Sequence, residues 1–353
     1  MAIIYVVVIT EIQRSLINNF FDNLDYIPTK ILIRTPNWLG DLIISTGFLR
    51  AVLETYPDSR VDIILKSGFE TLPIPKRGKI ILFDKNKNSA GKFGKTLRNH
   101  NYDCFYILPP SFSSAWMAFQ SKIPKRIGYA GGYRSLLLTT AKKHEFRPKS
   151  QHLLKDYLDL LSKELEMKEY SPLLEVENEW VKKHLSSFTL KIPEKFVVFT
   201  PGAIYGPSKQ WPLGNYRELG KQLYKAYGCK ILLLGTKDEV DFGTKIAHDY
   251  DWIYNYCGKT TLAQFLAILT KAQILVGNDS GSMHLMAALK RPQISVFGST
   301  SPTWTGPINV KATVMRKNLP CSPCFSRSCK FDHYECLTKI SPENVLAQIK
   351  KYF

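Results

Sequence analysis

Residues 274–302 have the sequence ILVGNDSGSMHLMAALKRPQISVFGSTSP. The opening apolar run, ILV, is typical of a short buried strand, and the small polar residues at 277–281 indicate a turn after it. The apolar spacing at 283–289 predicts a helix that ends before Pro292. A second apolar run leads into another small polar turn at 298–301. This order predicts a βαβ unit with both turns at the carboxyl ends of their strands.

Both turns favour a ligand that carries phosphate. Open parallel sheets bind ligands at the carboxyl ends of their strands, and accessible amides at a helix N-terminus, such as those of Ser280 and Gly281, bind anions. Two side chains here have a second interpretation. Asp279 is either a ligand-binding carboxylate or the N-cap of the helix, and His284 is either a site residue or a structural histidine.

The sequence just before this unit repeats the pattern. Strands are predicted at 196–200 and 230–234, and a helix at 216–227. Between the first strand and this helix lies a long turn, PGAIYGPSKQWP, at residues 201–212. We therefore expect a second α/β domain over residues 196–353.

The first half of the chain also alternates strands and helices. The run KILIR at 30–34 predicts the first strand, and a helix is expected at about 42–53. Asp41 falls where this helix begins, at the mouth of the sheet, and is either a helix cap or a general base. Further strands are predicted at 61–65, 80–83, 104–108 and 126–129.

The predicted fold class is α/β, with two parallel doubly wound sheets that face a central cleft. The N-terminal domain is expected at 30–175, with a helical pattern at 152–169. Acidic, proline and polar residues at 176–195 predict a linker. Residues 1–29 predict an extension that is either weakly amphipathic or a poorly ordered tail.

The net charge of +18 is concentrated in the N-terminal half. Residues 60–150 contain 18 Lys and Arg against 5 Asp and Glu. Nucleic acid, a membrane surface or a phosphorylated substrate would match this charge. The sequence has no recognised nucleic-acid-binding module, no apolar run of about 20 residues and no signal-peptide pattern. Because no such module is present, we expect no nucleic-acid partner, and a basic nucleic-acid-binding protein is the remote alternative.

Three separated tracts together resemble glycosyltransferase family 9, the bacterial heptosyltransferases of lipopolysaccharide inner-core assembly. They are the segment at 36–41, the turn at 201–212 and NDSGSMHLMAALKRP at 278–292. The resemblance covers the chain from about residue 30 onward. It implies the GT-B arrangement of two Rossmann-like domains, with the acceptor on the N-terminal one and the nucleotide sugar on the C-terminal one. The last two tracts are nearer to the enzymes that add the second inner-core heptose. The alternative is an enzyme of the same family that adds the first heptose or another sugar.

The resemblance also implies roles for single residues. Asp41 is expected to be the general base, and Lys209 is expected to stabilise the leaving ADP of an inverting transfer. The residues expected to bind the donor are Thr200, Gly202, Glu239, Asp279, Ser280, Gly281 and His284. The residues expected to bind the acceptor are Asn37, Trp38 and Arg126.

The implied donor is ADP-heptose, and the implied acceptor is lipid A–Kdo–heptose at the cytoplasmic membrane face. The protein is expected to be a monomer, cytoplasmic and peripheral to the inner membrane. We expect no essential cofactor, with Mg²⁺ tolerated but not required.

Four cysteines lie within sixteen residues near the C-terminus, in the pattern C-x2-C-x4-C-x6-C. They are Cys321, Cys324, Cys329 and Cys336, and they form a Cys-rich segment at 321–336. This density is compatible with a zinc or iron–sulfur site, but the spacing matches no standard finger. Such a metal would be structural, because the segment follows the catalytic motifs.

Overall fold

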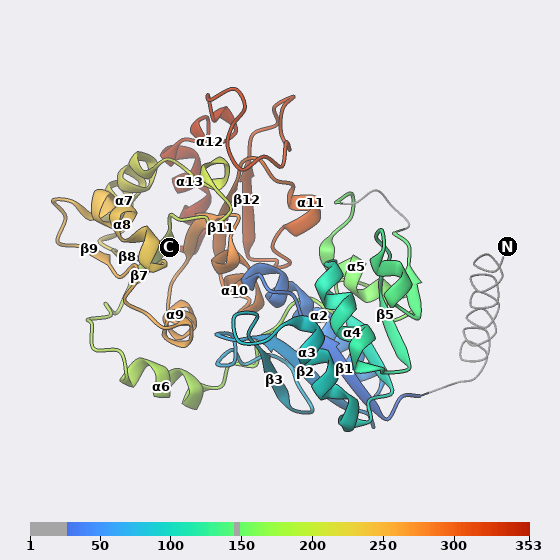
Figure 1. The fold of residues 1–353 in the computed structure, drawn as a ribbon. Helices are drawn as coiled ribbons and strands as arrows, with labels where there is room; N and C mark the ends of the chain where they lie inside the picture. Colours follow the sequence, from blue (N-terminus) through green and yellow to red (C-terminus); the bar gives the residue numbers. More distant parts are fainter. Residues whose placement is uncertain (1–26, 145–148) are drawn as a thin grey trace.

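The computed structural model describes residues 27–144 and 149–353, which form two α/β domains (Figure 1). Most of the predicted extension at 1–29 lies outside the described residues, so that prediction stays open. Each domain is built on a six-stranded sheet whose strands are all parallel, with helices on both faces. The predicted fold class is confirmed.

The N-terminal sheet has the strand order β3-β2-β1-β4-β5-β6. Its strands are β1 (Lys30–Arg34), β2 (Arg60–Lys66), β3 (Ile80–Phe83), β4 (Cys104–Ile107), β5 (Lys125–Tyr129) and β6 (Thr140–Lys142). The central strands β1 and β4 are buried along nearly their whole length because helices cover both faces.

The C-terminal sheet has the order β12-β11-β10-β7-β8-β9, which is the same topology. Its strands are β7 (Phe196–Thr200), β8 (Lys230–Leu233), β9 (Ile253–Asn255), β10 (Leu275–Asn278), β11 (Gln293–Phe297) and β12 (Ala312–Arg316). In each sheet, strands are added first on one side of the first strand and then on its other side. The point where this order reverses is the switch point at which open α/β sheets bind ligands.

The helices of the N-terminal half are α2 (Leu39–Thr55), α3 (Ala90–Thr96), α4 (Phe112–Ser121), α5 (Leu153–Asp159) and α6 (Asn178–Ser186). Those of the C-terminal half are α7 (Leu213–Tyr227), α8 (Val240–Ala247), α9 (Leu262–Leu269), α10 (Gly281–Ala288), α11 (Pro302–Thr305), α12 (Glu335–Thr338) and α13 (Pro342–Ile349).

Two segments between the domains differ from the sequence-based expectation. The helix predicted at 152–169 ends at Asp159, shortly before Ser162, whose φ of 56° lies in the left-handed region. A residue in the left-handed region interrupts a right-handed helix. The predicted linker at 176–195 contains α6, which packs against α9 of the C-terminal domain.

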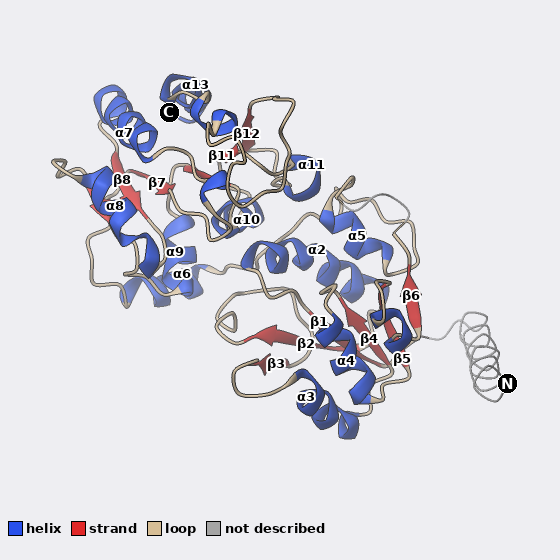
Figure 2. Ribbon diagram, turned by 45° about the horizontal axis from the view of Figure 1, so that its top comes forward, coloured by secondary structure: helices blue, strands red, loops and turns tan. Residues whose placement is uncertain are grey.

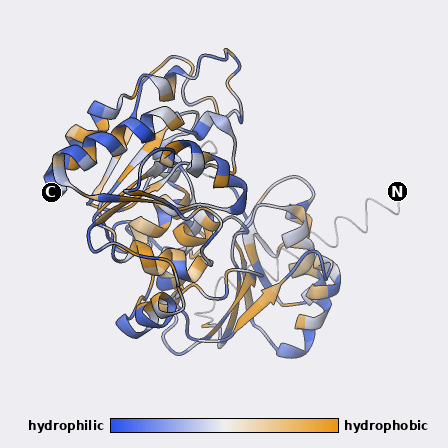
Figure 3. Ribbon diagram, turned by 90° about the vertical axis from the view of Figure 1, so that its left-hand side faces the viewer, coloured by the Kyte–Doolittle hydropathy of each residue, from blue (hydrophilic) through white to orange (hydrophobic). Residues whose placement is uncertain are grey.

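The two domains meet where α2 packs against α10. Both helices are buried nearly all round, which explains why neither has a polar face. One apolar core continues from the N-terminal sheet through this junction into the C-terminal sheet. Apolar colour accordingly concentrates on the strands and on the helices between the sheets (Figure 3). The contact brings the amino ends of α2 and α10 to the same point.

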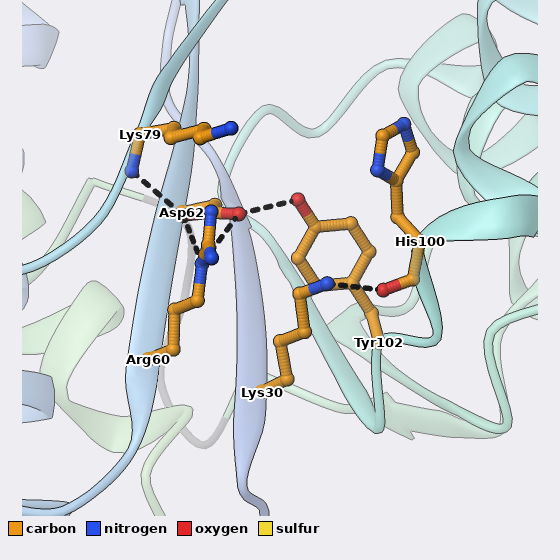
Figure 4. A network of polar contacts seen from close by, with 6 residues as sticks. All are labelled: Lys30, Arg60, Asp62, Lys79, His100 and Tyr102. Atoms are coloured by element: carbon orange, nitrogen blue, oxygen red, sulfur yellow. Dashed lines mark hydrogen bonds and ion pairs between the residues drawn. The ribbon is translucent and has the colours of Figure 1, made fainter.

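The N-terminal sheet also contains a buried carboxylate, Asp62 on β2 (Figure 4). It accepts hydrogen bonds from the Tyr102 hydroxyl at 2.7 Å and the Lys79 amide at 2.7 Å, and it pairs with Arg60 at 3.1 Å. Burial favours a raised pKa for Asp62, but these hydrogen bonds outweigh burial and the pKa is lowered. This network joins β2 to the chain before β4.

Among the described residues, no helix is both long enough and apolar enough to cross a bilayer.

Candidate active site

A cavity of about 540 Å³ lies between the domains. The N-terminal domain supplies Trp38, Leu39, Gly40, Asp41 and Lys149 to its wall. The C-terminal domain supplies the turn after β7, the start of α9, the start of α10, and residues that follow β8 and β11. The size is typical of a site for one small-molecule ligand.

Asp41 lies in the first turn of α2 and faces this cavity. Burial raises its pKa to about 6, opposed by the nearby charge of Lys209 and reinforced by that of Asp279. Trp38 is the N-cap of α2, so the helix does not need Asp41 as its cap. A partly dry carboxylate that ionises near pH 6 has the properties of a general base.

Lys209 and Asp279 form an ion pair at the opposite wall of the cavity. Their Nζ and Oδ2 atoms are 2.6 Å apart, and Thr300 donates to the same carboxylate oxygen at 2.5 Å. The Lys209 ammonium also lies 4.7 Å from the centre of the Tyr205 ring. Both members of the pair are largely buried, so their positions are fixed before any ligand arrives.

Asn278, the last residue of β10, explains how the Lys209 turn keeps its shape. It is fully buried, and its side-chain amide donates to Pro201 O at 2.7 Å and Gly202 O at 3.2 Å. Its oxygen accepts from the Trp211 amide at 3.0 Å. A single side chain thus ties both ends of the turn at 201–212 to the central strand.

The amino end of α10 has no side-chain cap. Its N-cap is Ser280, whose hydroxyl lies 2.8 Å from that of Ser282, which in turn donates to the Thr200 hydroxyl at 2.9 Å. The alternative that Asp279 is the N-cap is therefore wrong. Ser280, Gly281 and Ser282, at the uncapped start of the helix, line the cavity, and such a helix end is suited to an anion.

The helix junction leaves no space for side chains at two glycines. A Cβ on Gly40 would lie 2.8 Å from Cδ2 of His284, and a Cβ on Gly281 would lie 2.9 Å from a methyl carbon of Leu39. Burial lowers the pKa of His284 to about 4, so its imidazole is neutral at physiological pH. His284 both lines the cavity and packs directly beside the residue that precedes Asp41.

Glu239 lies at the end of the cavity that is farther along the C-terminal sheet. Its carboxylate accepts from the Thr236 amide at 2.7 Å, and it occupies the space that a Cβ on Gly202 would fill. Burial raises its pKa despite the Thr236 hydrogen bonds. The wall beside it is apolar and is formed by Leu234, Leu262 and Phe265. An acidic group beside an apolar wall fits a ribose next to a flat base.

The Cys-rich segment packs directly on the Lys209 turn. Ser208 donates its amide to Arg327 O at 3.2 Å and its hydroxyl to Ser326 O at 2.5 Å. Tyr205 donates its hydroxyl to Phe325 O at 2.5 Å. The segment therefore supports the part of the cavity wall that carries Lys209.

The four cysteines of this segment are free thiols. Over residues 27–144 and 149–353, no three His, Cys, Asp or Glu side chains are arranged to hold a metal ion. A structural metal on the cysteines stays a prediction. The sequence also contains an Asp-x-Asp triplet at 249–251, a pattern that can bind a metal ion. It is outside the cavity wall, and Asp249 pairs with His248 at 2.6 Å.

Most of the predicted site residues do meet at the cavity. Those that line it are Trp38, Asp41, Thr200, Gly202, Lys209, Glu239, Asp279, Ser280, Gly281 and His284. Two predicted acceptor residues do not. Arg126 donates to Leu137 O at 3.0 Å and Ile123 O at 2.6 Å in the outer part of the N-terminal domain, and Asn37 bonds to Arg34. Binding of the acceptor by Asn37 and Arg126 stays a prediction.

Several other residues of the cavity wall were missed, among them Lys149, Tyr205, Trp304, Phe325 and Arg327. Lys149 holds its ammonium 4.9 Å from the Trp304 ring and 4.1 Å from the Phe325 ring, across the two domains. Arg327 lies 5.5 Å from the ring of Tyr205. Only the Tyr205 position, inside the turn at 201–212, carried a signal in the sequence. Trp304 lies in the short helix α11, and the others come from loops without a recognisable pattern.

Comparisons with known proteins agree with this geometry. The family model described as glycosyltransferase family 9 (heptosyltransferase) matches residues 90–335. Lipopolysaccharide heptosyltransferase 2 of Salmonella typhimurium LT2 is 29% identical over 345 residues, covering 91% of this chain and 97% of the relative. Lipooligosaccharide heptosyltransferase 2 of Haemophilus influenzae Rd is 30% identical over 306 residues, covering 81% of this chain and 88% of the relative.

Solved structures give the same result. The Escherichia coli ADP-heptose lipopolysaccharide heptosyltransferase II superimposes with a TM-score of 0.78 at 29% identity, covering 92% of this chain and 98% of that one. A family 9 glycosyltransferase from Veillonella parvula has the same fold, with a TM-score of 0.77 at 20% identity over 92% and 97% of the two chains. The expected GT-B arrangement is thus confirmed, and the chain belongs to glycosyltransferase family 9, the heptosyltransferase family.

Proposed function

We propose that this enzyme transfers a heptosyl group from ADP-heptose to the first heptose of the lipopolysaccharide inner core. The observation that carries the proposal is a carboxylate with a pKa of about 6, Asp41, facing a buried Lys209–Asp279 pair across one cavity. The similarity to relatives named heptosyltransferase 2 supports the choice of step.

The donor occupies the C-terminal side of the cavity. Its adenine packs on the apolar wall around Phe265, and Glu239 accepts a hydrogen bond from a ribose hydroxyl. The diphosphate lies at the uncapped amino end of α10, beside Lys209. Thr200, Gly202, Ser280, Gly281 and His284 complete the donor side.

The transfer is a single displacement. Asp41 accepts the proton of the attacking acceptor hydroxyl while the new bond forms between that oxygen and the anomeric carbon. The bond from the anomeric carbon to the β-phosphate oxygen breaks, and ADP leaves with its electron pair. Negative charge grows on the diphosphate, where the Lys209 ammonium and the α10 amides stabilise it. One displacement from the opposite side inverts the anomeric configuration.

Cationic side chains balance the leaving group without an essential metal in this proposal. Besides Lys209, the wall carries Lys149 and Arg327, so three cations face one end of the cavity. Transfer should therefore continue after treatment with a chelator, and added Mg²⁺ should be tolerated.

The acceptor enters from the N-terminal side, past Trp38, which is 60% exposed at the cavity rim. Its carboxylates and phosphates match the positive charge of this half. We propose that the enzyme acts as a monomer in the cytoplasm, attached to the inner face of the inner membrane where its lipid acceptor lies.

Mass spectrometry of the glycolipid tests the proposal. Purified enzyme, ADP-heptose and lipid A–Kdo–heptose should yield a product heavier by one heptosyl unit, and Asp41→Asn should yield none. Modification only of an acceptor that lacks heptose would assign the first transfer instead of the second. No product with either acceptor would overturn the proposal.

A further inference from the structure

Helix α4 has an unusual composition for a helix at the surface of a domain. Its sequence is FSSAWMAFQS, with no charged residue. One face, with Ala115 and Ala118, is buried in the core beneath the N-terminal sheet. A surface helix normally presents charged side chains on its other face.

The other face of α4 presents three large aromatic side chains to solvent. Phe112, Trp116 and Phe119 recur at a spacing of four and three residues, and they are 54%, 37% and 40% exposed. Their rings form one stacked row, with 6.5 Å between the first two centroids and 5.7 Å between the last two. A contiguous apolar row of this kind on a soluble domain marks an interaction surface.

The central residue of the row, Trp116, packs on the neighbouring helix α3. The Trp116 indole lies over Gly91 of α3, where a Cβ would come within 2.6 Å of its Nε1 atom. A glycine there lets the indole lie low between the two helices. Because α3 and α4 are in extensive contact, the aromatic row is held in place by the packing of the two helices.

Positive charge surrounds the row. Residues 85–126 contain eight Lys and Arg, namely Lys85, Lys87, Lys92, Lys95, Arg98, Lys122, Lys125 and Arg126. They contain one acidic residue, Asp103, whose carboxylate is held by Thr29 and the Lys30 amide. Arg126 lies over the Phe119 ring at 5.9 Å, and Arg98 donates to Gln120 O at 2.8 Å.

This surface is separate from the active site. No residue of α3 or α4 lines the cavity, and the two helices cover the face of the N-terminal sheet away from the C-terminal domain (Figures 1 and 2). The aromatic row and the Lys and Arg around it are therefore not part of the nucleotide-sugar site.

We propose that the α3–α4 surface, defined by the aromatic row and the Lys and Arg around it, binds the surface of an anionic lipid bilayer. Aromatic side chains enter the headgroup region of a bilayer, and Lys and Arg bind anionic headgroups. The absence of any charge on α4 itself lets the rings enter without dehydrating an ion. This inference gives the membrane attachment proposed above a defined surface, but it does not depend on the transfer reaction.

Co-sedimentation with vesicles tests the inference without turnover. Full-length enzyme should bind vesicles of phosphatidylcholine and phosphatidylglycerol, and binding should weaken with salt and with pure phosphatidylcholine. The triple variant Phe112→Ser/Trp116→Ser/Phe119→Ser should reduce the partition coefficient by about 10-fold or more. Phe331→Ser is the matched control, because Phe331 is 68% exposed in the other domain, and it should leave binding unchanged.

A second variant keeps the test decisive if the triple serine variant fails to fold. Lys92→Glu/Lys95→Glu/Lys122→Glu changes three exposed side chains and should also lower vesicle binding by about 10-fold. Unchanged binding in both variants would overturn the proposal. Binding that is retained in both but lost on deletion of residues 1–26 would assign the attachment to that segment and would equally overturn it. ADP affinity should stay unchanged in both variants, which separates this result from a failure of the proposed reaction.

Discussion

The ammonium of Lys209 lies 2.6 Å from the carboxylate of Asp279, although 70 residues separate them in the sequence. The pair joins the turn after β7 to the end of β10, and both residues face the cavity. Asp279 therefore fixes the position of Lys209 before the donor binds. A cation that is already in place costs no reorganisation when the diphosphate leaves.

Lys209→Ala should lower kcat by about 100-fold or more, because the leaving diphosphate loses its nearest ammonium. ADP affinity should fall less than kcat, since the α10 amides remain. Steady-state kinetics and calorimetry with ADP measure the two effects. Lys237→Ala, an exposed lysine beyond the cavity wall, is the control, and an unchanged rate in Lys209→Ala would remove the assigned role.

The rate should depend on pH through Asp41. Since the pKa of Asp41 is raised to about 6, kcat/KM should fall below pH 6 as the base becomes protonated. Asp41→Asn should abolish transfer at every pH and leave ADP binding nearly intact. The variant should be no less stable than the wild type at pH 8, because the wild-type carboxylate is then ionised in a partly dry site. An equal loss of ADP affinity would contradict the role as base.

Gly40→Ala should reduce transfer by about 10-fold or more, because the new Cβ would lie 2.8 Å from His284 and would displace α2 from α10. The N-terminal domain itself should remain folded. Gly131→Ala is a suitable control, since its Cβ would meet nothing closer than 3.5 Å. Full activity in Gly40→Ala would show that the junction does not set the position of Asp41.

Tyr102→Phe should lower the free energy of unfolding by about 2 kcal/mol at pH 7, because buried Asp62 loses a hydrogen bond. The pKa of Asp62 is lowered in the folded protein, so this carboxylate contributes stability above pH of about 4, and the contribution is lost as the pH falls further. The difference between variant and wild type, measured by urea unfolding, should therefore shrink below pH 4. A difference that is independent of pH would contradict the assignment.

Arg327→Gln should weaken ADP binding by about 10-fold while adenosine binding is unchanged, because Arg327 lines the cavity beside Tyr205 and faces the diphosphate in our proposal. Calorimetry with the two ligands separates charge from base recognition. Lys330→Gln, an exposed position nearby that is not in the cavity wall, is the matched control. An equal loss for adenosine would indicate a distorted wall instead of a lost phosphate contact.

The sequence predicted the strands well where they are short, apolar and buried, as at 30–34 and 196–200, whose bounds agree with the structure. It also brought Asp41, Lys209 and Asp279 together, because turns at the carboxyl ends of parallel strands meet at one edge. It could not predict partners that depend on how the two domains pack.

Lys149 and Arg327 are examples of residues whose partners the sequence could not predict. Each reaches the cavity from a loop whose sequence has no periodicity, and their neighbours Trp304 and Tyr205 come from other segments. Arg126 is expected to bind the acceptor from the family resemblance alone; its guanidinium donates to Leu137 O and Ile123 O, outside the cavity wall. Whether such a residue reaches the cavity depends on the direction of its side chain, which residue spacing does not predict.

Release of ADP from ADP-heptose tests the central claim most directly. It should be measured with lipid A–Kdo–heptose, with the acceptor that lacks heptose, and without acceptor, for wild type and Asp41→Asn. We predict rapid release only for wild type with the heptose-bearing acceptor. Equal release by Asp41→Asn, or release that does not depend on the acceptor, would contradict a transferase in which Asp41 activates the acceptor hydroxyl.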